Sequence, residues 1–261
     1  MAAEAFERRR LELEAELGEP MTVDGVTAAW RIFQRKKGHR HSTDDVLTGF
    51  YALESAPHAN SILDLGAGIG TVGLLALSGM PHATLTSVEA QAVSFRLLQE
   101  NVRANGLESR VDMHHMDLRE LDLGRRFPLV TGSPPYFDVK AGVVPADSQK
   151  AHARFELRGT VSDYARAAVR HLEPGGQFVF CFPWAQKERA VRSVRAEGFA
   201  IVSQRDVIPR DGLPALFSVF RCELGTHDES VEEPFVVRDE HGKHTDAMHA
   251  LRARFGWPPQ F

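Results

Sequence analysis

Strand-like segments alternate with helix-forming segments through the middle of this sequence, and the alternation limits the folds that the chain can adopt. Five segments predict buried strands, at 62–65, 85–88, 110–116, 129–130 and 177–182. Four segments between or after them predict helices, at 71–77, 92–105, 160–172 and 186–197. Strands that alternate with helices form a mostly parallel sheet with helices on both faces. The sequence therefore predicts an α/β fold of this kind.

The segments at either end of the chain predict smaller additions to this sheet. Residues 2–17 are rich in helix formers, and an Asp24-Gly25 turn predicts a hairpin over 22–27. Strands at 201–207 and 216–223 predict a terminal β-hairpin. We expect three parts, namely an N-terminal helix and hairpin extension over 1–41, a main domain over 42–224, and a C-terminal appendage over 225–261 packed on the same domain.

The predicted strand ends carry acidic residues and a glycine loop. In an open parallel sheet, ligands bind outside the carboxyl ends of the strands. The first strand contains Asp64 and runs into the glycine loop 66–70, which lets a ligand approach the backbone closely. Glu89 ends the second strand and is placed to accept hydrogen bonds from ribose hydroxyls. Asp117 ends the third strand and can accept from an adenine amino group.

The fourth strand runs into the turn Ser133-Pro134-Pro135-Tyr136. Neither proline can donate to a strand ladder, so the backbone beyond the strand is stiff and keeps carbonyl groups available. A flat group with an NH2 could stack on Tyr136 and donate its hydrogens to Ser133 and a proline carbonyl. The structural alternative is a proline turn beside a core aromatic ring, because these are ordinary turn residues.

A nicotinamide-binding site is the rival interpretation of the glycine loop. Residues 68–73 match the pattern G-x-G-x-x-G, and Glu89 follows about 20 residues further on. However, the loop begins earlier, at Gly66, and Asp64 precedes it in the strand. A carboxylate at that position suits a cationic ligand better than a pyrophosphate. Hydride transfer also leaves the proline turn without a role.

Together, the run Asp64–Gly70, Glu89, Asp117 and the turn Ser133–Tyr136 resemble class I S-adenosylmethionine-dependent methyltransferases. The proline turn resembles the motif of members that methylate planar amino groups. Over 34–256 the chain resembles the bacterial tRNA adenine-N6 methyltransferases that act on valine tRNA. This resemblance implies a Rossmann-like, seven-stranded, mostly parallel sheet, S-adenosylmethionine as the cofactor, and N6 of adenine in tRNA as the acceptor.

The resemblance also implies which residues form the site. The residues expected to act on the acceptor are Ser133, Pro134, Pro135 and Tyr136. The residues expected to bind the cofactor are Thr43, Asp64, Gly66, Ala67, Gly68, Gly70, Glu89, Ala90, Asp117, Leu118 and Ser133. Methyl transfer to nitrogen needs no metal, so we expect no metal site.

The identity of the acceptor stays open because of Ser133. Relatives of the tRNA enzymes usually have asparagine at this position, and a serine hydroxyl is shorter and can also donate. A glutamine side-chain amide is planar and carries an NH2, so a protein-glutamine N5 methyltransferase or a small-molecule methyltransferase would use the same turn. A non-catalytic RNA-binding scaffold is a third alternative, against which the intact Asp64, Glu89 and Tyr136 argue.

Charge and composition bound the partners and the compartment. With 31 basic and 35 acidic residues the net charge is −4, which allows a local basic patch but excludes a uniformly basic surface. The most basic window contains Arg35, Lys36, Lys37 and Arg40, which could hold RNA phosphates or could equally form a solvated loop without a binding role. The charged N-terminus does not resemble a secretory signal, and no apolar run approaches the roughly 20 residues that span a membrane. We therefore expect a cytoplasmic protein without a membrane segment.

Overall fold

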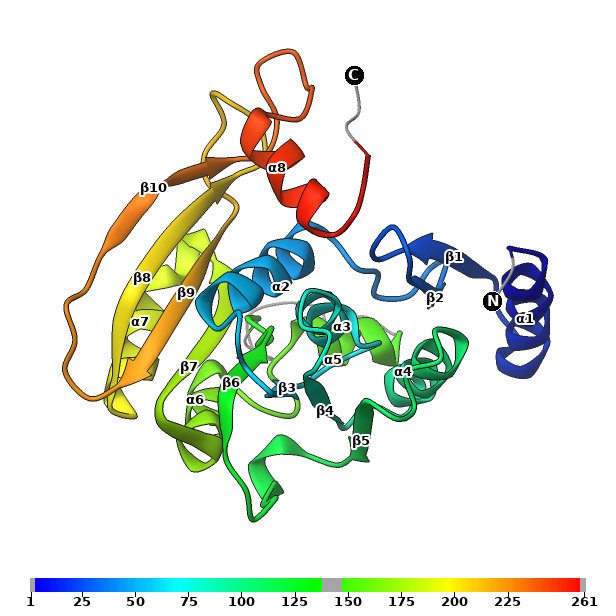
Figure 1. The fold of residues 1–261 in the computed structure, drawn as a ribbon, viewed down its shortest axis with the longest axis horizontal. Coiled ribbons are helices and arrows are strands. Elements are labelled where there is room, and N and C mark those ends of the chain that lie inside the picture. The colour runs from blue at the N-terminus through cyan, green and yellow to red at the C-terminus, as the bar shows by residue number, and fades with distance from the viewer. Residues whose placement is uncertain (1–2, 138–146, 259–261) are drawn as a thin grey trace.

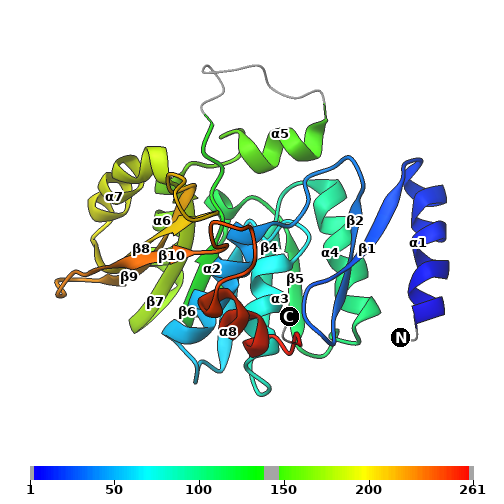
Figure 2. The same ribbon diagram turned by 90° about the horizontal axis from the view of Figure 1, so that it is seen from above.

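A sheet of eight strands runs through the structure, with helices on both of its faces (Figure 1, Figure 2). The computed structural model describes residues 3–137 and 147–258. The strands of this sheet are β3 (Ser61–Leu65), β4 (Thr84–Glu89), β5 (Val111–His115), β6 (Phe127–Gly132), β7 (Leu172–Pro183), β8 (Phe199–Ile208), β9 (Phe217–Leu224) and β10 (Val231–Val236). Their order is β10-β8-β9-β7-β6-β3-β4-β5. Strand β9 is antiparallel to both of its neighbours, and the other pairs are parallel.

The helices of the described residues mostly connect or cover these strands, and α1 packs instead beside the N-terminal hairpin. They are α1 (Ala3–Leu17), α2 (Thr43–Ser55), α3 (Thr71–Ser78), α4 (Ala92–Ala104), α5 (Ser148–Arg154), α6 (Val161–His171), α7 (Lys187–Ala196) and α8 (Asp246–Arg254), with the short 3-10 helices η1 (Leu118–Glu120) and η2 (Trp184–Gln186). Figure 2 shows α5 lying above one edge of the sheet, apart from the helices that pack on its faces.

The strands supply two hydrophobic cores because their apolar side chains alternate. In β7, Val179 and Cys181 belong to a core shared with α2, α3, α4 and α8. Phe178 and Phe180 of the same strand belong to the opposite core, shared with α6 and α7. Successive side chains of a strand point to opposite faces of its sheet, so burial on both faces requires the nearly continuous apolar runs seen in the sequence.

The predicted fold class is confirmed, but the predicted number of strands is wrong by one. The seven predicted strands are present, and β10 adds an eighth by pairing parallel with β8, where Val231 lies opposite Gln204. Within β10 only Phe235 is buried. An edge strand with one buried side chain resembles a polar loop in sequence, so the sequence alone predicts an appendage here.

The predicted N-terminal hairpin is present, but its turn lies further along the chain. Strand β1 (Met21–Gly25) pairs antiparallel with β2 (Arg31–Arg35), so Asp24 and Gly25 are inside a strand. A Cβ at Gly25 would lie 2.4 Å from the ring of Trp257. Asp24 Oδ2 accepts a hydrogen bond from Gln34 Nε2 at 2.8 Å. Asp24 therefore links the two strands, Gly25 leaves room for Trp257 of the C-terminal segment, and neither residue reverses the chain.

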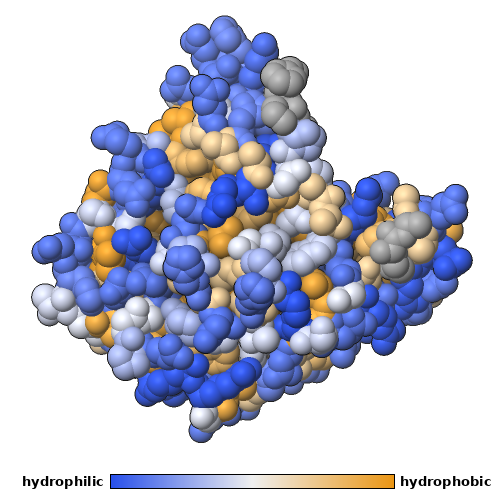
Figure 3. Space-filling model, in the orientation of Figure 1, coloured by the Kyte–Doolittle hydropathy of each residue, from blue (hydrophilic) through white to orange (hydrophobic). Residues whose placement is uncertain are grey.

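The surface is mostly hydrophilic on the face seen in Figure 3, where apolar residues gather below α8. Both cysteines, Cys181 and Cys222, are buried and free, as their apolar surroundings in the sequence predict. Over 3–137 and 147–258, no helix is both long enough and apolar enough to cross a membrane.

Candidate active site

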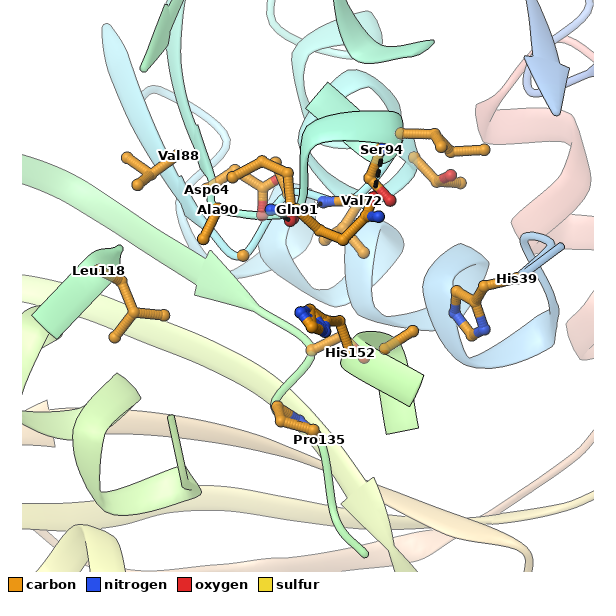
Figure 4. Close-up of a pocket in the computed structure, with 18 of the residues that line it drawn as sticks. His39, Asp64, Val72, Val88, Ala90, Gln91, Ser94, Leu118, Pro135 and His152 are labelled. Atoms are coloured by element: carbon orange, nitrogen blue, oxygen red, sulfur yellow. Dashed lines mark hydrogen bonds between the residues drawn. The ribbon is translucent and has the colours of Figure 1, made fainter. Parts of the chain in front are cut away.

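Neighbouring strands end together at one edge of the sheet. Leu65 of β3 lies opposite both Val88 of β4 and Gly132 of β6, and Glu89 lies opposite His115 of β5. The loops that follow these strands therefore meet, and a cleft opens between them (Figure 4). Its lining includes His39, His41, Asp45, Asp64, Gly66, Ala67, Gly68, Glu89, Ala90, Gln91, Leu118, Ser133, Pro135, Gln149, His152, Arg158 and Tyr164.

The loop after β3 has a shape that depends on glycine. Gly66 and Gly68 have φ angles of 61° and 58°, in the left-handed region that side chains disfavour. A Cβ at Gly66 would lie 2.0 Å from the hydroxyl oxygen of Tyr164. A Cβ at Gly132, at the end of β6, would lie 2.9 Å from the ring of the same tyrosine. The Tyr164 side chain from α6 therefore packs against both the glycine loop and the end of β6, in space that a side chain at either glycine would need.

Asp64 is buried beside the start of α3. It is 1% exposed, and its Oδ2 accepts a hydrogen bond from the Gly73 N–H at 3.1 Å. A Cβ at Gly73 would lie 2.7 Å from that oxygen, so the glycine makes room for the carboxylate. Burial raises the pKa of Asp64 to about 7; the Gly73 hydrogen bond opposes the shift and the Glu89 carboxylate adds to it.

Glu89 ties the glycine loop to the segment after β4. Its Oε2 accepts from the Gly68 N–H at 2.8 Å, and its Oε1 accepts from the Gln91 N–H at 2.6 Å. Burial raises the pKa of Glu89, and the hydrogen bonds from Gln91 and Gly68 oppose this shift. The carboxylate therefore fixes the loop, and its anionic form remains less stable than in water although Arg158 also stabilises it.

Asp45 brings a third acid to the cleft from the first turn of α2. Burial raises the pKa of Asp45 well above its usual value, and the neighbouring Asp44 carboxylate adds to the shift. Three carboxyl groups at one cleft are thus all less stable as anions than they would be in water. A ligand that carries positive charge and hydroxyl groups would relieve this cost.

Helix α5 covers the cleft and is anchored to the N-terminal extension. Arg35 Nη2 of β2 lies 2.6 Å from Asp147 Oδ2, and Asp147 caps α5 by accepting from the Lys150 N–H. Gln149 is buried and accepts from the His39 N–H at 3.2 Å. The position of this cover therefore depends on contacts between segments that are far apart in sequence.

The proline turn follows β6 directly and borders the cleft with Ser133 and Pro135. Ser133 Oγ lies 3.5 Å from Cys181 Sγ of β7. The ring of Tyr136 packs against Phe137, with centroids 4.5 Å apart, and edge-on against Phe182 at 6.4 Å. The turn therefore packs against β7 through Cys181 and Phe182.

The cleft brings together most of the residues that the sequence predicts for the site. Those that line it are Asp64, Gly66, Ala67, Gly68, Glu89, Ala90, Leu118, Ser133 and Pro135. Those that adjoin it in the chain without lining it are Thr43, Gly70, Asp117, Pro134 and Tyr136. Asp117 pairs instead with Arg119, whose Nη2 lies 2.7 Å from Asp117 Oδ2.

Sequence reasoning missed several residues of the cleft, among them Asp45, His152 and Tyr164. Asp45 Oδ2 also accepts a hydrogen bond from the Ser42 N–H at 3.0 Å and so caps α2. The sequence around Asp45 therefore predicts a helix cap and gives no sign that this residue lines the cleft as well. His152 and Tyr164 lie on separate helices, and no spacing in the sequence links them to the strand ends. In the described part of the chain, no group of three or more His, Cys, Asp or Glu side chains is arranged to hold a metal ion.

Comparisons with known proteins point to one class of enzyme. A family model described as the methyltransferase small domain matches residues 50–191. A tRNA1(Val) (adenine(37)-N6)-methyltransferase of Vibrio cholerae is 26% identical over 205 residues, which cover 77% of this chain and 82% of the relative. The enzyme of the same name from Vibrio vulnificus strain YJ016 is 27% identical over 208 residues, covering 80% and 85%.

Solved structures share the fold at lower identity. The crystal structure of a predicted O-methyltransferase from Agrobacterium tumefaciens has a TM-score of 0.65 and 17% identity, covering 82% of this chain and 97% of that one. A tRNA m1G37 methyltransferase from M. jannaschii has a TM-score of 0.57 and 14% identity, covering 79% and 55%.

Proposed function

Because the chain belongs to the methyltransferase small domain family, we propose that it transfers the methyl group of S-adenosylmethionine to N6 of an adenine in tRNA. The names of its relatives from two Vibrio species support this substrate. One observation carries the proposal: Ser133 and Pro135 line the same cleft as the buried acids Asp64 and Glu89. A methyl donor held by the acids would therefore meet an amino group held by the turn. We expect the reaction in the cytoplasm, where tRNA is present.

The residues of the cleft fit S-adenosylmethionine in their chemistry. Asp64 and Glu89 are buried carboxyl groups with raised pKa values, and ammonium, sulfonium and ribose hydroxyl groups stabilise carboxylates. Asp64 would lie near the methionine portion and Glu89 near the ribose, beside a loop that leaves its backbone open to close approach. When bound, the cofactor supplies an electrophilic methyl group on sulfur. Asp117 Oδ2 accepts one hydrogen bond, from Arg119 Nη2, and a carboxylate oxygen can accept a second, so Asp117 could still accept from the amino group of the cofactor's adenine.

The proline turn would orient the target amino group. Ser133 Oγ and the Pro134 carbonyl would each accept one amino hydrogen, which favours a localised lone pair on the nitrogen. Tyr136 would stack on the base, which must leave its own helical stack to reach the turn. Orientation and electrostatic stabilisation would then supply most of the rate, without a covalent enzyme intermediate.

Two lysines of the basic window are our candidates for phosphate contacts. Lys36 and Lys37 are exposed. Arg35, by contrast, has a side chain that is 11% exposed and paired with Asp147, and Arg40 Nη2 lies 3.1 Å from Asp24 Oδ2. We therefore assign Arg35 to the anchoring of α5 and keep the two lysines as RNA contacts.

Replacing both lysines by alanine should weaken tRNA binding and its dependence on salt. Each lost phosphate contact reduces the salt slope by about 1, so we expect the slope to fall by about 2 in filter-binding titrations at several salt concentrations. Lys243→Ala, which removes an exposed lysine of the C-terminal segment, serves as the control. An unchanged slope in the double variant would remove the two lysines from the RNA interface.

The proposed function is tested by incubating the protein with methyl-labelled S-adenosylmethionine and separate tRNA, rRNA and protein fractions. We expect label in tRNA, as N6-methyladenosine after digestion. Label in protein alone would overturn the tRNA assignment in favour of a glutamine amide acceptor.

Tyr136→Ala should lower kcat/KM for the RNA by about 10- to 100-fold, because stacking of a base on an aromatic ring contributes about 1–3 kcal/mol to binding. Cofactor affinity, measured by calorimetry, should stay unchanged. Tyr51→Ala is the matched control, since Tyr51 lies on α2 outside the lining of the cleft. Transfer at the wild-type rate in Tyr136→Ala would contradict the assignment of the turn.

A further inference from the structure

His152 is a cleft residue to which the proposed mechanism gives no role. It lies on α5 and lines the cleft together with Ser133 and Pro135. Figure 4 shows its ring between Pro135 on one side and Asp64, Ala90 and Gln91 on the other. The ring therefore lies between the acceptor turn and the acids that would hold the cofactor.

The ring has a polar atom that the protein itself does not satisfy. Within the residues that the structure describes, Nδ1 of His152 is buried and has no hydrogen-bond partner. A buried polar atom without a partner is unfavourable, and proteins retain few of them. Because the ring borders a cleft, a ligand in that cleft is the partner that would satisfy it.

The helix that carries His152 is held at its start by several contacts. Asp147 caps the helix and pairs with Arg35 of the N-terminal extension. Gln149 donates from Nε2 to Ser94 Oγ at 3.2 Å, which ties the helix to the first turn of α4. His152 follows one turn later, so its ring is presented from a fixed support, as positioning of a substrate requires.

The imidazole of His152 is neutral at neutral pH. Burial lowers its pKa, and the nearby Arg158 guanidinium adds to this shift. A neutral imidazole carries one N–H donor and one acceptor. It can therefore lie beside a cationic cofactor without charge repulsion, and it still has one hydrogen to donate.

We propose that the Nδ1–H of His152 donates a hydrogen bond to the ring nitrogen next to the amino group that is methylated. This inference rests on the proposed function. Ser133 and the Pro134 carbonyl accept from the amino group, and His152 reads the acceptor beside it. Adenine presents such acceptors at N1 and N7, on either side of its amino group. His152 is thus a specificity-determining residue, because a base with an N–H at that position would oppose its donor.

The test combines a protein variant with altered bases in the RNA substrate that the wild-type enzyme methylates. RNAs carrying adenosine, 1-deazaadenosine or 7-deazaadenosine at the target position are compared for kcat/KM and for binding affinity. With the wild-type enzyme, one deaza base should lower kcat/KM by about 10- to 100-fold, as expected for the loss of a hydrogen bond that leaves a buried group unpaired. His152→Phe should show a similar loss with adenosine and no further loss with that deaza base.

Matched controls separate this role from a structural one. His152→Asn, which keeps a donor, should recover part of the activity with adenosine. In His114→Phe, the deaza base should lower kcat/KM as much as it does in the wild type, because His114 lies on β5 outside the cleft lining. Cofactor affinity should be the same in wild type and His152→Phe, and the melting temperature of the ligand-free variant should not fall, because the phenyl ring removes a buried polar atom that has no partner.

Three outcomes would overturn the inference. The first is a deaza penalty in His152→Phe as large as in wild type for both bases, which would show that His152 does not contact the ring nitrogen. The second is a loss of cofactor affinity in His152→Phe, which would assign the side chain to the cofactor. If the wild-type enzyme methylates no adenosine in RNA, the proposed function itself fails, and this inference fails with it. If the enzyme methylates adenosine in RNA but the deaza bases reduce kcat/KM equally in wild type and His152→Phe, only the inference about His152 fails and the proposed function stands.

Discussion

Asp64→Asn is expected to stabilise the cofactor-free protein above pH 7 and to remove most of its cofactor binding. The pKa of Asp64 is about 7 in the folded chain, against about 3.9 in an unfolded one. Between these values the folded chain keeps a proton that the unfolded chain releases, so the free energy of unfolding decreases as pH rises. The decrease is complete above about pH 7 and reaches at most about 4 kcal/mol.

The asparagine variant has no charge to bury and can still accept from the Gly73 N–H. Its free energy of unfolding should therefore exceed that of the wild type at pH 8 and should vary less between pH 5 and 7. Urea unfolding at a series of pH values measures both. Asp228→Asn removes an exposed carboxylate and should leave the pH dependence unchanged. The same slope in Asp64→Asn and wild type would show that Asp64 is already ionised in the folded protein.

Asp64→Asn should weaken cofactor binding although it stabilises the cofactor-free protein. Removing one partner of a buried ion pair costs about 3–5 kcal/mol, so Kd for S-adenosylmethionine should rise by 100-fold or more. In the wild type, a bound cation would favour the ionised carboxyl group and lower its pKa. Binding near pH 6 should therefore release a proton, which calorimetry in buffers of different ionisation enthalpy detects. Proton uptake, or no exchange, would contradict this role.

Glu89→Ala is expected to weaken cofactor binding by about 10²- to 10³-fold. Hydrogen bonds to charged groups contribute about 1.5–3 kcal/mol each, and Glu89 accepts from the N–H groups of both Gly68 and Gln91. Its removal would leave these two donors unpaired and would take away the proposed acceptor for the ribose hydroxyls. Calorimetric titration with S-adenosylmethionine gives the affinity.

Glu89→Gln shows whether cofactor binding depends on the charge of Glu89 or only on the size of its side chain, and Glu120→Ala is the control. Glu89→Gln keeps the shape, but its amide NH2 would face one of the two backbone donors, so it should lose affinity as well. Glu120→Ala removes an exposed acid from η1 and should bind the cofactor like the wild type. Near-normal affinity in Glu89→Gln would mean that the charge of Glu89 is not needed.

The sequence predicts the sheet well because burial on both faces leaves a clear signal. β3, β4 and β6 are each buried at all but one position, and parallel neighbours bring their ends to one edge. The acids and the glycine loop at that edge are therefore visible without coordinates. Strand β10 cannot be recognised in the sequence, because only Phe235 of that strand contributes to a core.

The cover of the cleft could not be predicted for a different physical reason. It depends on long-range polar contacts, such as Arg35 with Asp147 and His39 with Gln149, and no local pattern encodes them. Arg35 therefore resembled a candidate RNA contact in the sequence. The place of Asp45 in the cleft could not be predicted either, since the residues around it in the sequence are those of an ordinary helix cap.

The packing of Tyr164 has a consequence for the geometry of catalysis. Both Gly66, in the loop that would hold the donor, and Gly132, in the strand that leads to the acceptor turn, abut this one ring. Two segments that pack against one side chain are held relative to each other. In the proposed reaction, the distance between the methyl donor and the acceptor nitrogen would therefore depend on how closely these two glycines allow the backbone to approach Tyr164.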